Sequence, residues 1–169
     1  MQILAGKHKG VSIQTSAKYN YRPTQSRVRK SLFDILGDLT GLSVVELFAG
    51  SGILGFEALS RGAEDVTFVE LNSHLVKLLY KNKEKINTDK CNIRKMDVFN
   101  FINEKHKYDL ILGDPPYGQK ELNLLIKSCL KMLNPDGLLV LETSTKDMHT
   151  SADRERIYGS TKLSFWSKR

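Results

Sequence analysis

The chain has 169 residues, the size of one domain, with a net charge of +7, 40% hydrophobic and 27% charged residues. It contains no apolar run near the ~18–20 residues of a membrane span and no secretory-type N-terminus. Two cysteines without a CxxC pair indicate reduced thiols, and four scattered histidines show no metal-ligand spacing. We therefore expect one cytoplasmic domain over residues 1–169, a monomer without a metal site.

Positive charge is concentrated at the front of the chain. Residues 1–40 hold seven basic and two acidic residues and contribute +5, whereas the rest contributes +2. This excess is consistent with general solubility or with a lobe that binds phosphate groups.

The first 40 residues read as a hairpin followed by a basic helix. Alternating apolar residues at 2–5 and 11–14 flank a turn bounded by Gly6 and Gly10. From about Thr24 to Leu36, apolar residues recur at helical spacing. We expect these two elements to pack on a core formed by residues 41–169.

Strands and helices then alternate. The expected strands are Ser43–Phe48, Val66–Glu70, Asn92–Lys95, Tyr108–Gly113 and Leu138–Glu142, with a closing hairpin of Glu155–Tyr158 and Thr161–Phe165. The expected helices are Gly52–Arg61, Ser73–Ile86, Val98–Asn103 and Gln119–Leu133, the last followed by a turn over Asn134–Gly137. This order predicts an α/β, Rossmann-like fold, a seven-stranded and mostly parallel sheet with helices on both faces. Ligands bind such sheets at the carboxyl ends of the strands.

A glycine-rich loop follows the first core strand. Gly50, Gly52 and Gly55 satisfy G-x-G-x-x-G, and Glu70 lies twenty residues past Gly50 at the end of the next strand. On spacing alone, this pattern also fits a dinucleotide-binding site, so an NAD-dependent oxidoreductase is an alternative.

Three carboxylates at successive strand ends favour a cationic adenosine cofactor. Glu46 just before the loop opposes a pyrophosphate but suits the ammonium and sulfonium of S-adenosylmethionine. Glu70 can accept from ribose hydroxyls, and Asp97 from the adenine amine, although Asp97 could also cap a helix. The predicted cofactor-binding residues are Glu46, Phe48, Ala49, Gly50, Ser51, Gly52, Glu70, Leu71, Asp97 and Val98.

The fourth core strand ends in Asp114-Pro115-Pro116-Tyr117. Two prolines make a stiff, non-helical turn, in which the Asp114 carboxylate and the Pro115 carbonyl can accept both N–H bonds of a ring-bound amine. Tyr117 can stack on a flipped base. The four residues are the predicted catalytic motif of an amino-group methyltransferase that acts on nucleic-acid bases.

Two longer stretches resemble the bacterial RsmD family. They are Arg22-Pro23-Thr24-Gln25-Ser26-Arg27-Val28-Arg29-Lys30-Ser31-Leu32-Phe33 and residues 47–63, and the closing residues 158–163 are also similar. The resemblance implies a class I methyltransferase fold and methylation of the N2 amine of guanine 966 in 16S rRNA, within a partly or fully assembled small ribosomal subunit. Many members carry Asp where this chain has Glu46.

The resemblance also implies that part of the basic region lies near the active-site mouth. Because Lys30 falls on the same side of the helix as Arg27, we add it to the predicted RNA-binding residues, which are Arg22, Thr24, Arg27, Arg29 and Lys30. The arginines could instead only solvate the helix. A DNA adenine-N6 methyltransferase and a non-catalytic RNA-binding factor remain alternatives.

Overall fold

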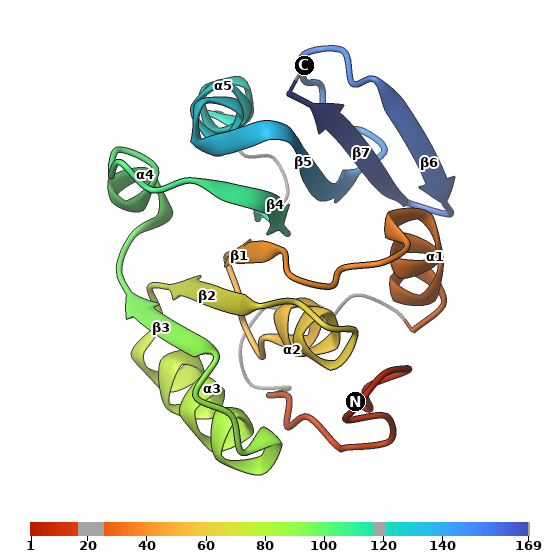
Figure 1. Cartoon of the computed structure of the whole chain (residues 1–169). Helices are drawn as coiled ribbons and strands as arrows, with labels where there is room; N and C mark the ends of the chain where they lie inside the picture. The colour runs from red at the N-terminus through yellow and green to blue at the C-terminus, as the bar shows by residue number, and fades with distance from the viewer. Residues whose placement is uncertain (17–25, 117–120, 169) are drawn as a thin grey trace.

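A computed structural model describes residues 1–16, 26–116 and 121–168 (Figure 1). These residues form a seven-stranded sheet with the strand order β3-β2-β1-β4-β5-β7-β6. Its strands are β1 (Ser43–Leu47), β2 (Asp65–Glu70), β3 (Cys91–Lys95), β4 (Tyr108–Gly113), β5 (Leu133–Ser144), β6 (Arg154–Tyr158) and β7 (Thr161–Ser167). Strands β1 to β5 pair in parallel, and β7 pairs antiparallel with both β5 and β6. The expected α/β fold with a mostly parallel sheet is confirmed.

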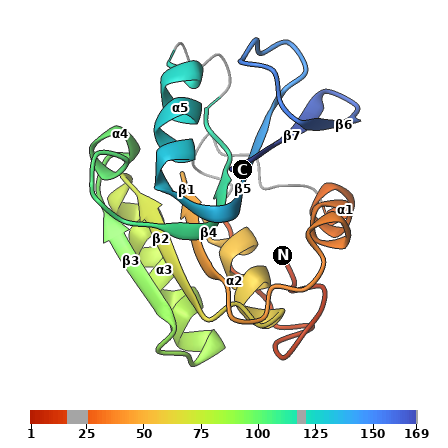
Figure 2. The same cartoon turned by 45° about the horizontal axis from the view of Figure 1, so that its top comes forward.

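Helices cover both faces of this sheet (Figures 1 and 2). They are α1 (Ser26–Leu36), α2 (Ile53–Ser60), α3 (Ser73–Ile86), α4 (Val98–Phe101) and α5 (Leu122–Met132). Because side chains alternate along a strand, the neighbours Val44 and Val45 belong to two different cores. The core with Val44 contains side chains of α1, α2 and α3, and we call this side the α2 face. The core with Val45 contains side chains of α4 and α5.

The strand order reverses between β1 and β4, which are neighbours although two strands separate them in sequence. The carboxyl ends of β1, β2 and β4 therefore meet at one edge of the sheet, beside the point where the chain changes direction. This is the position where open α/β sheets bind their ligands.

Strand β5 is longer than expected. The sequence predicts a turn over Asn134–Gly137 and a strand from Leu138, but β5 begins at Leu133, directly after α5. Its pairing with β4 shifts register between Tyr108 and Leu110, and Asp136 has a φ of 61°. The turn residues thus form a bulge inside the strand, because the amide of Asp136 bonds to the Lys168 carbonyl of the edge hairpin. The other elements with both ends described lie within two residues of their expected bounds.

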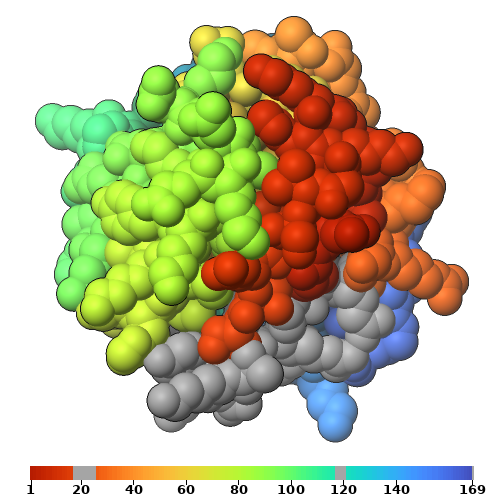
Figure 3. Space-filling model, turned by 90° about the horizontal axis from the view of Figure 1, so that it is seen from below, coloured from red at the N-terminus to blue at the C-terminus, as the bar shows by residue number. Residues whose placement is uncertain are grey.

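The N-terminal segment, residues 1–16, packs along the outside of the domain. Its expected hairpin contains one antiparallel bridge, Gln2 to Ser12, together with backbone bonds that join residue 3 to residues 10 and 11. Figure 3 shows this segment in red beside the yellow-green region of α3. Asn82 of α3 binds both the amide and the carbonyl of Gln14, at 2.8 and 3.0 Å, so the segment is fastened to the helix.

Candidate active site

The glycine loop after β1 is held to the end of β2 by Glu70. One carboxylate oxygen of Glu70 accepts the Gly50 N–H at 2.9 Å, and the other accepts the Asn72 N–H at 2.8 Å. Gly52 has a φ of +77°, and a Cβ there would lie 2.6 to 2.9 Å from Leu79, Phe56 and Phe68. The loop requires glycine at this position because the backbone is left-handed there and because the core side chains leave no room for a Cβ.

Phe48, the first residue after β1, has a φ of 55°. This left-handed conformation is rare for a bulky residue and is maintained only where the surrounding structure imposes it. Such strain is typical of functional loops. Nothing in the sequence pattern pointed to it.

A cavity of about 470 Å³ opens at the ends of β1, β2 and β3. It is lined by Phe48, Glu70, Leu71, Asn72, Asp97, Val98, Phe99 and Pro116. Five of these were predicted to bind the cofactor and Pro116 was assigned to the catalytic motif, whereas Asn72 and Phe99 were missed. Two carboxylates between apolar walls suit an adenosine group, whose ring is flat and whose ribose offers two hydroxyl donors.

Asp97 has the capping role that the sequence left as an alternative. Its Oδ1 accepts the backbone N–H groups of Phe99 and Asn100, at 2.8 and 3.3 Å, at the start of α4. The residue also lines the cavity, so capping fixes the carboxylate at the cavity wall. The two interpretations are therefore compatible.

Glu46 is buried beneath the glycine loop, with 4% of its surface exposed. Its Oε2 accepts the Gly55 N–H at 2.8 Å, which satisfies a donor in the first turn of α2. Burial is the main cause that raises the pKa of the Glu46 carboxyl to about 8, and the Glu70 charge adds to it. A contact between Glu46 and a cofactor stays a prediction.

The remaining predicted loop residues, Ala49, Gly50, Ser51 and Gly52, are buried. The Ser51 carbonyl accepts a bond from Asn82 at 3.0 Å, so α3 connects the loop to the N-terminal segment. Contacts between these four loop residues and a cofactor also stay predictions.

The catalytic motif follows β4 at the same edge of the sheet. Asp114 is mostly buried, Pro115 is buried, and the exposed Pro116 lines the cavity that contains Glu70 and Asp97. Tyr117 lies outside the described residues. The described part of the motif is thus brought to the predicted cofactor site, although more than forty residues separate it from Glu70 in sequence.

Glu142 is a strand-end carboxylate that the sequence reasoning missed. Gly113 of β4 pairs with Leu141 of β5, so the next residues along each strand, Asp114 and Glu142, lie side by side. Burial raises the pKa of Asp114 well above its usual value, and the Glu142 and Glu46 carboxylates raise it further. Glu142 is the last residue of an expected strand, and this position at a strand end was the signal available in the sequence.

The predicted RNA-binding residues do not share one environment. Arg27 and Lys30 are exposed on α1, and the Lys30 ammonium pairs with Asp34 at 2.7 Å. Arg29 is fully buried, so its prediction as a surface RNA contact is wrong. Arg22 and Thr24 lie outside the described residues.

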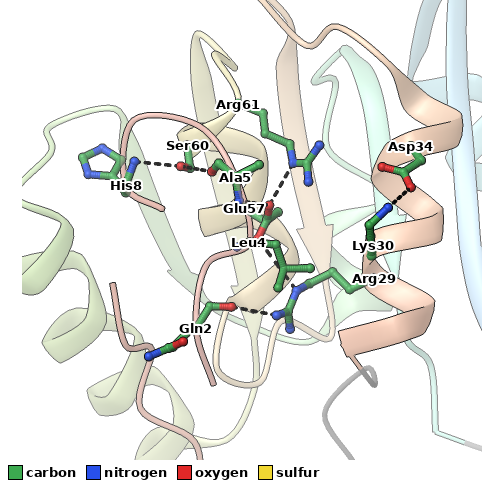
Figure 4. Close-up of polar contacts among 10 residues, drawn as sticks. All are labelled: Gln2, Leu4, Ala5, His8, Arg29, Lys30, Asp34, Glu57, Ser60 and Arg61. Carbon is green, nitrogen blue, oxygen red and sulfur yellow. Dashed lines mark hydrogen bonds and ion pairs between the residues drawn. The ribbon is translucent and has the colours of Figure 1, made fainter. Parts of the chain in front are cut away.

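Arg29 is instead part of a charge cluster that fastens the N-terminal segment to α2 (Figure 4). Its guanidinium donates to the Gln2 carbonyl at 2.7 Å and lies 3.8 Å from the Glu57 carboxylate. Glu57 also accepts the backbone N–H groups of Leu4 and Ala5 and the Arg61 side chain, at 2.7, 3.1 and 2.8 Å. A charge this buried persists because an opposite charge and hydrogen bonds surround it.

The site thus combines a cavity that suits an adenosine group with acceptors for N–H donors at its rim. Within the described residues, no group of three or more His, Cys, Asp or Glu side chains is arranged to hold a metal ion. No helix among them is long and apolar enough to cross a bilayer. The arrangement suits the transfer of a group between a bound cofactor and an amine.

Comparison with known proteins shows the family to which the chain belongs. A family model described as "Conserved hypothetical protein 95" matches residues 1–167. Ribosomal RNA small subunit methyltransferase D of Haemophilus influenzae is 34% identical over 85% of this chain and 78% of its own length. A candidate rRNA methyltransferase of Bacillus subtilis, YlbH, is 31% identical over the full length of both chains. The solved structure of a candidate methyltransferase of Escherichia coli, yhhF, has a TM-score of 0.88 and 25% identity, covering 99% of this chain and 97% of that one.

Proposed function

Since the chain belongs to this family, the RsmD family, we propose that it is an rRNA methyltransferase that transfers a methyl group from S-adenosylmethionine to the N2 amine of guanine 966 of 16S rRNA. The observation that carries the proposal is the shared cavity. Pro116 of the Asp114-Pro115-Pro116 turn lines the same space as Glu70 and Asp97, so an amine held at the turn is next to the cofactor.

The cofactor supplies a methyl group on a positively charged sulfur, which is a good leaving group. Glu70 has a second lone pair on each carboxylate oxygen after its bonds to Gly50 and Asn72, and these can accept ribose hydroxyls. Phe48 and Phe99 offer apolar walls for the adenine ring. The nearby carboxylates complement the positive charge of the cofactor.

The turn after β4 holds the nucleophile. An amine on an aromatic ring is a poor nucleophile, because its lone pair is delocalised into the ring. Asp114 and the Pro115 carbonyl accept its two hydrogens and direct the lone pair at the methyl carbon. On methyl transfer the amine nitrogen would become positively charged, and Asp114 would stabilise this charge until the nitrogen releases a proton to the carboxylate or to water. Positioning two reactants in this way contributes roughly 7–11 kcal/mol to lowering a barrier.

The carboxylate pair at the strand ends favours guanine over adenine. Guanine carries an N1–H beside its N2 amine, whereas adenine has a lone pair at N1 beside its N6 amine. Glu142, adjacent to Asp114, offers a second acceptor on the same side of the sheet. A carboxylate there accepts the guanine N1–H and repels the adenine N1 lone pair, which supports guanine as the target base.

The substrate under this proposal is 16S rRNA in a partly or fully assembled small subunit, and the enzyme acts as a cytoplasmic monomer. The exposed basic residues Arg27 and Lys30 lie on α1, and Arg27 shares a pocket with the turn before β7, which pairs with the carboxyl end of β5. Arg22 and Thr24 remain predicted RNA contacts.

The test is methyl transfer to purified substrates. We expect label from S-adenosylmethionine to enter small subunits from a strain that lacks this activity, and mass spectrometry of the digested rRNA to find N2-methylguanosine at position 966. A matched reaction uses subunits from the parent strain, which are already methylated and take up no label.

Other outcomes would replace the proposal. Label in DNA as N6-methyladenine, with none in rRNA, would favour the adenine-N6 enzyme. Calorimetric binding of NAD without binding of S-adenosylhomocysteine would favour an oxidoreductase. Tight binding to subunits without any transfer would indicate a non-catalytic RNA-binding factor.

A further inference from the structure

A second, polar cavity of about 430 Å³ lies between α1 and the β6–β7 hairpin. Arg27 and Val28 line it from α1, and residues 157–161 line it from the hairpin turn. We call it the hairpin pocket. Figure 2 shows α1 beside this hairpin, on the side of the sheet away from α4 and α5. Its volume is in the range of pockets that hold small ligand groups.

A side-chain contact keeps the two walls of the hairpin pocket together. The hydroxyls of Ser31 on α1 and Tyr158 on β6 are hydrogen-bonded. Arg27 is one turn before Ser31 and on the same side of the helix, so its guanidinium faces the hairpin turn. The pocket is therefore formed by a fixed helix and a fixed hairpin.

The hairpin pocket lies at the same edge of the sheet as the proposed active site. Thr161 of β7 pairs with Ser144, two residues past Glu142 on β5, and the Thr145 amide donates to the Ser160 carbonyl. Two strand spacings, about 10 Å, separate β7 from β4, which ends at the catalytic turn. Leu112 of β4 and Leu163 of β7 both belong to the core of the α2 face, so this face is continuous from the strand before the catalytic turn to the strand that follows the hairpin turn.

The chemistry of the hairpin pocket suits a phosphate group. Its lining residues include Arg27 and three residues with hydroxyl side chains, one of which is the Tyr158 bonded to Ser31, and none of them carries a carboxylate. Gly159 at the turn has a φ of +61° and no atom within 4 Å of an added Cβ, so its backbone is open to a ligand. Ile157, 64% exposed, adds an apolar edge against which a ribose can pack. Guanidinium groups bind phosphate oxygens in pairs, with hydroxyls completing the contact.

We propose that the hairpin pocket binds a phosphodiester group of the rRNA strand next to the target base, with Arg27 as its main contact. The proposal rests on the proposed function and adds a subsite to it. An anchored phosphate fixes the register of the strand without reading its sequence, so that one base reaches Asp114.

The experiment compares two arginines of similar exposure. Arg27→Gln removes the charge from the hairpin pocket, whereas Arg156→Gln, on β6 and outside the pocket lining, is the matched control. Ile157→Glu places a carboxylate at the pocket without disturbing the core. Steady-state methylation of small subunits is measured over a series of salt concentrations, and S-adenosylhomocysteine binding by calorimetry checks that each variant is folded.

We expect Arg27→Gln and Ile157→Glu to raise KM about tenfold with little change in kcat, the loss of one charged phosphate contact. The slope of log kcat/KM against log salt falls by about one for Arg27→Gln. Arg156→Gln changes both quantities much less. Naked rRNA fragments show the same ranking in filter binding.

Equal effects of Arg27→Gln and Arg156→Gln would overturn the subsite, because a general charge effect explains them. An effect on subunits but not on naked rRNA would point to a ribosomal protein in the pocket and would also overturn it. In both cases the wild-type protein still methylates guanine, so the proposed function stands. Failure of the proposed function is distinct, because the wild-type protein then transfers no methyl group to rRNA.

Discussion

The molecule contains two groups of buried ionisable side chains, one that combines opposite charges and one made of acids only. The N-terminal charge cluster consists of the positive Arg29 and Arg61 and the negative Glu57. Glu57 contacts both arginines and accepts two backbone N–H groups of the N-terminal segment. At the strand ends, Glu46, Asp114 and Glu142 have the same sign, and the pKa values of Glu46 and Asp114 are raised. The first arrangement satisfies its charges internally and stabilises the fold. The second repels itself and suits an external cation or N–H donor, as expected of a functional site.

The largest effect is expected from breaking the N-terminal charge cluster. Glu57→Ala leaves Arg29 buried without its carboxylate and the amides of Leu4 and Ala5 without an acceptor. We expect a loss of about 3–5 kcal/mol of unfolding free energy in urea titrations. The double variant Glu57→Ala/Arg29→Met should recover part of that loss, since the fully buried charge of Arg29 is removed and only the partly exposed Arg61 is left without the carboxylate. A cost below about 1 kcal/mol for Glu57→Ala would show that the cluster is not structural.

Asp114→Asn tests the other group and should separate activity from stability. We expect kcat to fall about 100- to 1,000-fold, because the amide carries no charge to stabilise the developing cation. The melting temperature should stay the same or rise, since Asn replaces a carboxyl group whose charged form is disfavoured by burial and by the neighbouring acids. S-adenosylhomocysteine affinity, measured by calorimetry, serves as the fold control. Full activity in Asp114→Asn would remove this residue from the mechanism.

Glu142→Gln sharpens the assignment of the target base. In subunits reconstituted with ligated 16S rRNA that carries 2-aminopurine at the target position, the base keeps its N2 amine but loses the N1–H. The wild type should methylate this base poorly. The amide that Glu142→Gln introduces can donate to N1, so we expect about tenfold recovery, equivalent to roughly 1.4 kcal/mol. Glu64→Gln, on the surface, is the charge control, and the same preference in all three proteins would contradict the role of Glu142.

The raised pKa of Glu46 predicts a dependence of stability on pH. The folded state retains a proton that the unfolded state releases, so unfolding free energy falls as pH rises from about 4.5 to about 8. Because one pKa unit corresponds to about 1.4 kcal/mol, we expect Glu46→Gln to be less sensitive over this range by about 1–3 kcal/mol. Urea unfolding of both proteins at pH 5 and pH 8 measures the difference. Parallel pH profiles would argue against a protonated Glu46.

The smallest effect is expected at the surface pair of Lys30 and Asp34, which are 70% and 54% exposed. Lys30→Ala should change unfolding free energy by no more than about 0.5 kcal/mol, because water screens the pair. A much larger loss of unfolding free energy, measured by thermal unfolding, would mean that solvent exposure does not distinguish weak surface ion pairs from the stabilising buried pairs.

Much of the fold and of the candidate cofactor site could be predicted because the signals are local. Apolar periodicity located the strands and helices, and the Gly50 loop and the Asp114 turn followed from spacing and residue type. Arg29 was misplaced, because a guanidinium next to exposed positions on α1 gives no sign of the carboxylate that buries it. Glu57, its partner, comes from a helix almost thirty residues later. The extension of β5 was missed for a similar reason, since its bulge depends on bonds to Lys168.

By itself, the sequence determined which residues follow each strand, and therefore which carboxylates and prolines stand at the catalytic edge. This is possible because parallel strands direct all their carboxyl ends to one side. Only the tertiary structure decided which of these residues are neighbours: that Glu142 stands beside Asp114, and that Arg27 faces the hairpin turn. Strand order and helix docking are set by contacts between distant segments, and no local pattern encodes them.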